Sequence, residues 1–252
     1  EAALDISLKQ PAEANLWAER LRGRVLPTRS IRLTAHGRIE DLPGYAEGAW
    51  WVQDAAAALV ARAAGNVTGR AVADLCAAPG GKTAGLAAAG ATVTAVEVSP
   101  KRLDRLRANL QRLGLSAVVV AADVADWAPE RTFDAVILDA PCTATGTIRR
   151  HPDILRLKRP EDVDRMAGLQ RALLANASRL VRPDGLLVYS TCSLEPEEGE
   201  HQIAAFLRSR PDFGRVSIAA DELGADPDWV TAAGDLRTLP CHLELEPSEL
   251  SG

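Results

Sequence analysis

From residue 71 to residue 209 the chain alternates short apolar runs with segments of helical periodicity. Five runs have the composition of buried strands: 71–75, 92–98, 118–121, 133–139 and 185–192. The clearest helix pattern follows the second run, because Ser99 and Pro100 supply an N-cap and a first-turn proline and Gly114 supplies a stop. This alternation predicts an α/β fold, with a largely parallel sheet and helices on both of its faces.

The first 43 residues have another pattern, which ends at Pro43-Gly44. The elements expected there are a strand at 4–9, a helix at 11–21 and a strand at 30–34. This stretch is too short to bury a core alone, so we predict a small α+β subdomain at 1–43 that packs on a catalytic domain at 44–252. The Ala-rich segment 49–64 predicts a helix, with Trp50 and Trp51 packed in the core or at the junction.

Both ends of the chain carry weaker patterns. Because the chain starts at Glu1 and its only methionine is Met166, we expect a segment to precede it. After Ser209 the sequence is loop-like and acidic, and the final HLELEPSELSG is expected to be disordered or truncated.

The composition, 47% hydrophobic and 25% charged, is that of a globular protein. No apolar run approaches the ~20 residues that span a bilayer, and no signal-peptide pattern opens the chain, so we predict a cytoplasmic monomer without a membrane partner. The four cysteines lack metal-ligand spacing, so no metal site is predicted and the thiols are expected to be reduced.

The net charge of −5 argues at first against a nucleic-acid partner, but the charge is unevenly distributed. Residues 145–182 hold 9 basic and 4 acidic side chains, whereas residues 193–252 hold 4 basic and 13 acidic ones. The first forty residues add 7 basic against 5 acidic. Since local potential steers a phosphate backbone, the basic regions indicate an RNA-facing surface, with an ordinary solvated face as the alternative.

A glycine-rich loop, CAAPGGK, joins the first predicted strand of the sheet to a helix. Its last residues resemble a P-loop, but that motif needs glycine where this chain has Cys76, so a phosphate cradle is not supported. Glu97 ends the second strand at the position that binds ribose hydroxyls in nucleoside-binding sheets, and Asp123 follows the third strand, within reach of an adenine edge. A helix cap is the alternative for each acid alone.

Two thiols end the last two predicted strands. The run FDAVILDAPC ends with Asp139 and Cys142, and GLLVYSTC ends with Cys192. Neighbouring parallel strands end at one edge of a sheet, so both sulfurs are expected there, although an inert buried cysteine is the alternative for either alone. A thiolate that adds to C6 of a pyrimidine makes C5 nucleophilic towards a methyl donor. A carboxylate can assist at N3 and the exocyclic amine, and a second thiol or base can help to release the product.

Four segments, DLCAAPGGKT, VEVSPKRL, LDAPCTATGTIRRHPD and YSTCS, together resemble the RsmB/NOL1/NOP2/Sun-domain RNA (cytosine-5)-methyltransferases, especially the bacterial ribosomal RNA type. The resemblance extends from about Gly44 to Leu207. It implies a Rossmann-like class I methyltransferase sheet, Cys192 as the nucleophile, Cys142 in product release, Asp139 as the assisting acid and S-adenosylmethionine as the cofactor. The cofactor contacts that it implies are Cys76, Ala77, Ala78, Pro79, Gly80, Gly81, Lys82, Glu97, Asp123 and Asp139.

The sequence departs from this family in two ways. It contains no NusB-like N-terminal domain, and its C-terminus does not read as the family's final antiparallel hairpin, so the sheet is expected to lack an edge strand. The leading hypothesis is 5-methylcytosine formation in 16S ribosomal RNA through a covalent Cys–C6 intermediate. A tRNA substrate, a non-catalytic RNA-binding or ribosome assembly factor, and a DNA cytosine methyltransferase are the alternatives.

Overall fold

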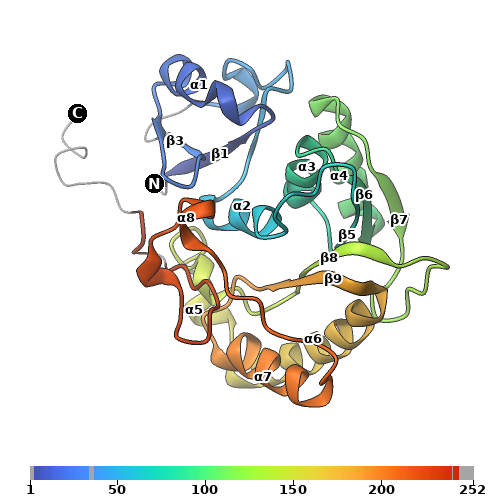
Figure 1. The fold of residues 1–252 in the computed structure, drawn as a ribbon. Coiled ribbons are helices and arrows are strands. Elements are labelled where there is room, and N and C mark those ends of the chain that lie inside the picture. The colour runs from blue at the N-terminus through green and yellow to red at the C-terminus, as the bar shows by residue number, and fades with distance from the viewer. Residues whose placement is uncertain (1–2, 34–36, 240, 244–252) are drawn as a thin grey trace.

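Two sheets form the framework of the protein in the computed structural model, which describes residues 3–33, 37–239 and 241–243 (Figure 1). The larger sheet is parallel and has the strand order β7-β6-β5-β8-β9. Its strands are β5 (Ala71–Leu75), β6 (Thr92–Glu97), β7 (Val118–Ala121), β8 (Phe133–Asp139) and β9 (Val181–Ser190). The predicted parallel α/β sheet is therefore confirmed. All five strands end at the same edge, which is where such sheets place their ligands.

Helices cover both faces of this sheet (Figure 1). The helices that pack on its two faces are α2 (Ala55–Arg62), α3 (Gly81–Ala88) and α4 (Pro100–Leu113) on one side and α6 (Pro160–Leu180) and α7 (Glu200–Ser209) on the other. Alternate residues of β5 explain the arrangement: Val72 contacts the first group, whereas Ala73 and Leu75 contact α6. Both faces are thus apolar, as the unbroken hydrophobic strands predict.

The smaller sheet is antiparallel, with the order β2-β3-β1-β4. Its elements are β1 (Leu4–Leu8), the turn Pro11–Glu13, α1 (Ala14–Leu21), β2 (Arg24–Val25), β3 (Ile31–Leu33), the turn Ile39–Asp41 and β4 (Trp50–Val52). Trp17 and the fully buried Trp50 pack in its core. Because β4 completes the sheet, the sheet extends past the predicted boundary at residue 43. The division into subdomain and catalytic domain stays a prediction.

The predicted helix at 49–64 is wrong over its first third. Residues Trp50–Val52 pair with β1 as β4, and the helix begins only at Ala55. Asp54 caps it, since its Oδ1 accepts a hydrogen bond from the Ala56 N–H at 2.9 Å. Strand alternation points Trp50 into the N-terminal core and Trp51 towards α3 and α4, so the predicted core and junction packing of the two indoles is confirmed.

The segment 182–185, whose Pro-Asp-Gly sequence is typical of a turn, lies within β9 instead. The register is irregular there: Phe133 pairs with Val181, but Ala135 pairs with Leu186, and Asp184 has a φ of 59°. The shorter elements are the turn Thr145–Thr147, α5 (Ile154–Leu157), the turn Pro196–Glu198, α8 (Ala220–Leu223) and the turn Pro227–Trp229. Within the described residues β9 is an edge strand. Most of the predicted disordered tail lies outside them, as does Thr34.

A search of the described part of the chain for a helix with the length and hydropathy of a membrane span finds none.

Candidate functional site

The glycine-rich loop leads from β5 into α3 and is held close to its neighbours. Gly80 has a φ of +103°, which favours glycine, and a Cβ at this position would lie 3.1 Å from Leu106 Cγ. A Cβ at Gly81 would lie 3.2 Å from Gln53 Nε2. With glycine at its N-cap and at its first position, α3 begins without a capping side chain, an arrangement that favours an electron-rich ligand group.

Helix α4 ties down the carbonyl groups of the same loop. Arg102 donates a hydrogen bond to the Ala78 carbonyl, and Asn109 Nδ2 donates to the Pro79 carbonyl at 2.9 Å. These bonds fix the orientation of the peptide units, so the loop is shaped before any ligand arrives.

Cys76 begins the loop with a left-handed φ of 59°. Burial, together with the carboxylates of Glu97, Asp139 and Asp74, raises the pKa of its thiol to about 12. A thiol that stays protonated at neutral pH is a poor nucleophile. The structure thus gives Cys76 no catalytic character, in keeping with its predicted place among cofactor contacts.

The two acids predicted for nucleoside recognition both make local turn contacts. Glu97, 1% exposed at the end of β6, accepts a hydrogen bond from the Ser99 N–H at 3.0 Å and pairs with Arg102 at 3.0 Å. Asp123 is exposed after β7 and accepts from the Ala125 N–H at 2.9 Å. Each acid therefore makes a hydrogen bond within the turn after its strand, and neither is the N-cap residue of a helix, which was the alternative left open by the sequence. Their contacts with ribose and adenine stay predictions.

Lys82 and Asp139 join the glycine-rich loop to the end of β8. Lys82 Nζ lies 2.6 Å from Asp139 Oδ2, and Ser190 Oγ donates to Asp139 Oδ1 at 3.1 Å. The pair is partly shielded, with side chains 13% and 34% exposed, so solvent screens it less than a surface ion pair. An ammonium and a carboxylate thus lie together where β5, β8 and β9 end.

The two thiols meet beside this pair. Cys142 follows β8, Cys192 follows β9, and their sulfurs lie 3.4 Å apart, in hydrogen-bond contact. This contact lowers the pKa of Cys192 and raises that of Cys142, whose burial raises it further. Lys82 also lowers the pKa of Cys192, whereas Asp139 raises it. The sequence prediction that both sulfurs share one edge is confirmed. The geometry favours a thiolate at Cys192 and a protonated thiol at Cys142.

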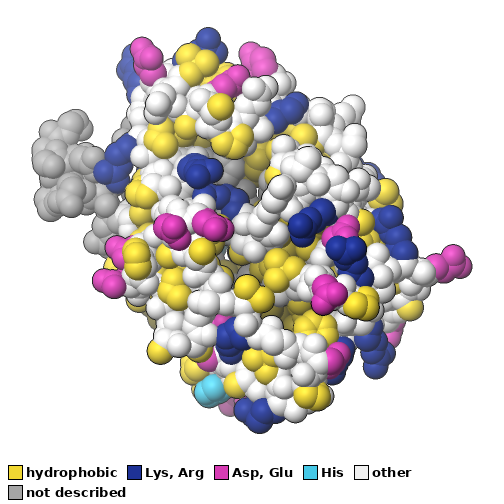
Figure 2. All heavy atoms as spheres, in the orientation of Figure 1, with side chains coloured by type: hydrophobic (Ala, Val, Ile, Leu, Met, Phe, Trp, Pro, Cys, Tyr) yellow, Lys and Arg dark blue, Asp and Glu magenta, His cyan; other side chains and the backbone are white. Residues whose placement is uncertain are grey.

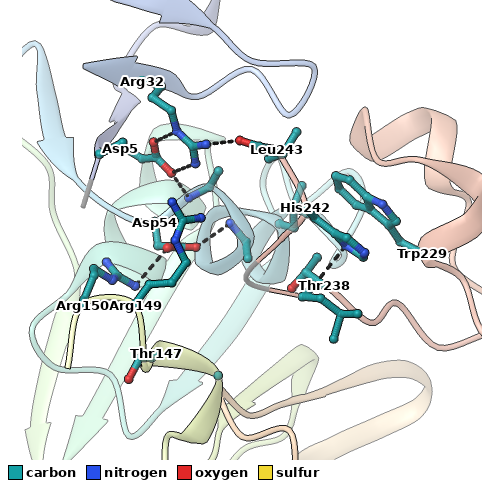
Figure 3. A pocket seen from close by; sticks show the side chains of 16 residues that line it. Asp5, Arg32, Asp54, Thr147, Arg149, Arg150, Trp229, Thr238, His242 and Leu243 are labelled. Atoms are coloured by element: carbon teal, nitrogen blue, oxygen red, sulfur yellow. Dashed lines mark hydrogen bonds and ion pairs between the residues drawn. The ribbon is translucent and has the colours of Figure 1, made fainter. Parts of the chain in front are cut away.

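The loop after Cys142 contacts the N-terminal part of the protein. Arg150 Nη2 lies 2.9 Å from Asp54 Oδ2, and Figure 3 shows Arg149 beside it, both reaching towards Asp54. They line a cavity of about 110 Å³ together with the buried ion pair of Asp5 and Arg32, whose Nε and Oδ1 are 2.7 Å apart. The smaller sheet and α2 therefore help to fix the loop that carries Cys142.

A larger hollow of about 590 Å³ opens next to the two thiol-bearing loops. Thr143 and Leu194, which lie one and two residues after the thiols, form one wall. The short helix α5 and the start of α6 form the other, with Lys158 and Arg159 at its edge and Leu155 73% exposed. The hollow offers apolar surface and positive charge side by side, close to the sulfurs.

Two buried carboxyl groups of the site were not singled out in the sequence. Asp74 lies under the glycine-rich loop, accepts a hydrogen bond from Thr83 Oγ1 at 2.5 Å, and has its pKa raised to about 6, chiefly by burial. Glu198 lies beneath the thiols and is fully buried. The signal for Asp74 was an acid inside an apolar strand. Glu198 looked like an ordinary helix-starting acid, so only the structure identifies it.

Comparisons with known proteins agree with this geometry. The family model of the 16S rRNA methyltransferases RsmB/F matches residues 65–246. The sequence is 46% identical over 188 residues to the ribosomal RNA small subunit methyltransferase B of Salmonella arizonae. That match covers 73% of this chain and 44% of the relative, so the chain spans less than half of the relative's length.

Solved structures give the same result. PH0851 superposes with a TM-score of 0.80 at 31% identity, covering 87% of this chain and 53% of that one. NSun6 from Pyrococcus horikoshii, solved with SFG, gives 0.63 at 29% identity, covering 69% of this chain and 46% of that one. The family resemblance and the Rossmann-like α/β fold expected from the sequence are thus confirmed.

Proposed function

The chain belongs to the 16S rRNA methyltransferase RsmB/F family, and on that premise we propose that it transfers a methyl group from S-adenosylmethionine to C5 of a cytosine in ribosomal RNA. The observation that carries the proposal is the 3.4 Å contact between Cys142 and Cys192 beside the Lys82–Asp139 pair. Two thiols, a carboxylate and an ammonium in one place are the groups that this reaction requires. A non-catalytic RNA-binding factor would have no need to maintain a thiol pair of this polarity.

The end of the sheet fits S-adenosylmethionine. Glycines at 80 and 81 leave a surface of backbone at the start of α3, where side chains would fill the space, and Oε2 of the nearly buried Glu97 makes an ion pair with Arg102 but no hydrogen bond among the described residues. In the proposal the loop holds the amino-acid end of the cofactor, Glu97 the ribose and Asp123 the adenine edge. Bound there, the cofactor supplies an electrophilic methyl group. NSun6 from Pyrococcus horikoshii, a structural neighbour, was solved with SFG in its crystal.

The residues of the chain then divide the work. Cys192, the sulfur with the lowered pKa, adds as a thiolate to C6 of the cytosine, and the C5=C6 electrons move towards N3. Lys82 stabilises the negative charge that develops at N3, and the Asp139 carboxylate accepts a hydrogen bond from the exocyclic amine and holds the base in place. The electron pair then returns to C5, which forms its new bond to the methyl carbon, and the electron pair of the bond that the methyl group leaves stays with the sulfur of the cofactor.

Cys142 completes the proposed cycle as a base. Its pKa is raised most by the hydrogen bond to the Cys192 sulfur, then by burial, and then by the charge of that sulfur. The hydrogen bond and the charge both come from Cys192. Once Cys192 is bonded to carbon it carries no charge, so both influences weaken and Cys142 can lose its proton. The Cys142 thiolate then removes the C5 proton, the C5=C6 bond reforms, and Cys192 leaves as a thiolate. The bonding of Cys192 to carbon thus allows Cys142 to act as the base.

The target base must leave its stack to reach the sulfurs. In the proposal the backbone of the RNA crosses the face shown in Figure 2, where Lys and Arg side chains, with some Asp and Glu side chains among them, lie around a central hollow that exposes apolar side chains. The exposed basic side chains beside the thiol loop are those of Arg149, Arg150, Arg156, Lys158 and Arg159.

Mass spectrometry of digested RNA tests the proposal. We expect the full chain, incubated with S-adenosylmethionine and unmethylated 16S rRNA, to produce 5-methylcytidine, and tRNA serves as the comparison. Methylation of tRNA but not of 16S rRNA would identify tRNA as the substrate and contradict the proposed ribosomal RNA substrate. No methylcytidine in either RNA, despite cofactor binding by calorimetry, would contradict the proposal.

A further inference from the structure

Glu198 is an unusual residue for its position. It ends the short turn before α7, and its side chain is 0% exposed, although carboxylates are rarely buried without compensation. Four neutral donors provide that compensation. They are the Thr143 N–H at 3.0 Å, Thr143 Oγ1, Ser193 Oγ at 2.5 Å and Gln170 Nε2 at 2.9 Å.

The donors come from the loops that carry the thiols. Thr143 directly follows Cys142, and Ser193 directly follows Cys192. The two hydroxyl groups also lie 3.1 Å apart, so the carboxylate closes a small network between the loops. Gln170 adds a third connection from α6, since its Nε2 donates at 2.9 Å to the Pro141 carbonyl as well.

Regular sheet hydrogen bonds do not extend this far. The β8–β9 ladder has its last pair at Asp139 and Ser190, followed by one bond from the Ala140 N–H to the Ser190 carbonyl at 2.9 Å. Beyond it the regular ladder stops, and the Gly146 N–H donates one backbone bond to the Cys192 carbonyl, also at 2.9 Å, while Thr145 Oγ1 accepts a bond from the Leu194 N–H at 2.9 Å. We propose that Glu198 is the positioning residue that holds the Cys142 and Cys192 sulfurs in contact. Its catalytic consequence rests on the proposed function, whereas the contact itself does not.

The sulfur contact is what distinguishes the two thiols. Cys192 faces Cys142 and the charged pair of Lys82 and Asp139. The half-buried Tyr189, which donates to the Glu198 carbonyl at 2.8 Å, lies beside Cys142. When the loops separate, Cys192 loses its hydrogen-bond donor and its pKa rises towards the ordinary value. A purely electrostatic role of Glu198 predicts the opposite, because removing a negative charge lowers the pKa of a nearby thiol.

Alkylation of Cys192 by iodoacetamide, followed by mass spectrometry across a pH series, tests the proposal without RNA or cofactor. In Glu198→Ala we expect the midpoint of the profile to move upward, with alkylation at pH 7 falling about tenfold because the thiolate fraction falls. Glu198→Gln keeps one acceptor oxygen and reverses the bonds to the two hydroxyls, so we expect a smaller upward shift. Glu197→Gln, the exposed neighbour, is the matched control and stays at the wild-type midpoint.

Calorimetry with S-adenosylmethionine adds a second readout, for which we expect unchanged affinity, since Glu198 contacts neither the glycine-rich loop nor Glu97. If Glu198→Ala fails to fold, Glu198→Gln and Ser193→Ala decide the question. An unchanged or lowered midpoint in folded Glu198→Gln would overturn the proposal, as would equal losses of cofactor affinity and thiol reactivity. A further outcome is that the wild-type protein forms no methylcytidine while the alkylation midpoint of Cys192 still moves upward in Glu198→Ala. That result would reject the proposed function and would leave the positioning role of Glu198 intact.

Discussion

Lys82 Nζ and Asp139 Oδ2 lie 2.6 Å apart and link the glycine-rich loop to the end of β8. Their charges act on Cys192 in opposite directions, because Lys82 lowers the pKa of that thiol and Asp139 raises it. Lys82 therefore favours a negative charge at this place and Asp139 opposes it, while Asp139 can still accept a hydrogen bond from the base. This balance makes the two roles of Asp139 separable by experiment.

Asp139→Asn removes the carboxylate and leaves Lys82 as the only charge of the pair beside Cys192. We expect the pKa of Cys192 to fall, so alkylation of Cys192 at pH 7 proceeds at least as fast as in the wild type. Methylation should nevertheless slow by about 10²-fold or more, because the assisting group for the cytosine is lost. Parallel alkylation and methyl-transfer assays measure the two effects. Equal losses in both assays would contradict a role for Asp139 in the chemical step.

Cys142→Ala removes the proposed base for product release. We expect RNA to remain attached to Cys192 after methyl transfer, visible as a band of reduced mobility on a denaturing gel. The variant also loses the hydrogen bond that lowers the pKa of Cys192, so the adduct should form faster at pH 8.5 than at pH 7. No adduct at either pH, with cofactor and RNA present, would exclude Cys142 from product release.

Gly146 lies against the loop that carries Cys192. A Cβ at this position would lie 2.8 Å from the Cys192 carbonyl oxygen, so Gly146→Ala forces that loop to move. We expect turnover to fall by about 10²-fold, the order of loss for a misplaced catalytic group, with cofactor affinity unchanged. Gly168→Ala is the control, since this exposed glycine of α6 has open space around it. Its activity should stay normal and its stability rise by about 0.5–1 kcal/mol. Normal turnover in Gly146→Ala would show that the loop position matters little.

Asp74 predicts a pH dependence of stability. The folded state keeps the proton up to about pH 6, whereas the unfolded chain loses it near the ordinary aspartate pKa of 3.8. The folded state binds more protons between these values, so this group's contribution to the free energy of unfolding is lost as the pH rises from about 4 to about 6. Asn at position 74 does not titrate, so the free energy of unfolding of Asp74→Asn should rise by up to about 3 kcal/mol relative to that of the wild type between pH 4 and pH 7. Urea unfolding at both pH values measures the difference. Asp104→Asn, on the surface, serves as the control, and parallel pH profiles for the wild type and Asp74→Asn would contradict the prediction.

Much of the large sheet could be predicted because its information is local. The strand at 133–139 is a run of apolar residues, and α4 carries its own signals at Ser99, Pro100 and Gly114. The prediction of a helix from residue 49 was wrong because the alanines of the segment 49–64 favour a helix, whereas pairing with β1 decides the structure of Trp50–Val52. Asp54, a good N-cap, was the local sign that the helix starts later.

The candidate site also has features that the sequence predicts and features that it does not. The strand ends placed Cys142 and Cys192 at one edge, since parallel topology alone requires it. The bonds to Glu198 could not be predicted, because its donors Thr143 and Ser193 lie 55 and 5 positions away and the pattern around it is that of an exposed acidic turn. Burial of a carboxylate is a tertiary property.

The central claim is that Cys192 bonds to C6 of the cytosine, and RNA carrying 5-fluorocytidine tests it most directly. Fluorine at C5 cannot leave as a proton does, so the methylated adduct cannot collapse and should accumulate. We expect peptide mapping of the trapped complex to place the RNA on Cys192, and no complex to form with Cys192→Ala. A complex mapped to another residue, or full methylation of ordinary RNA by Cys192→Ala, would contradict the claim.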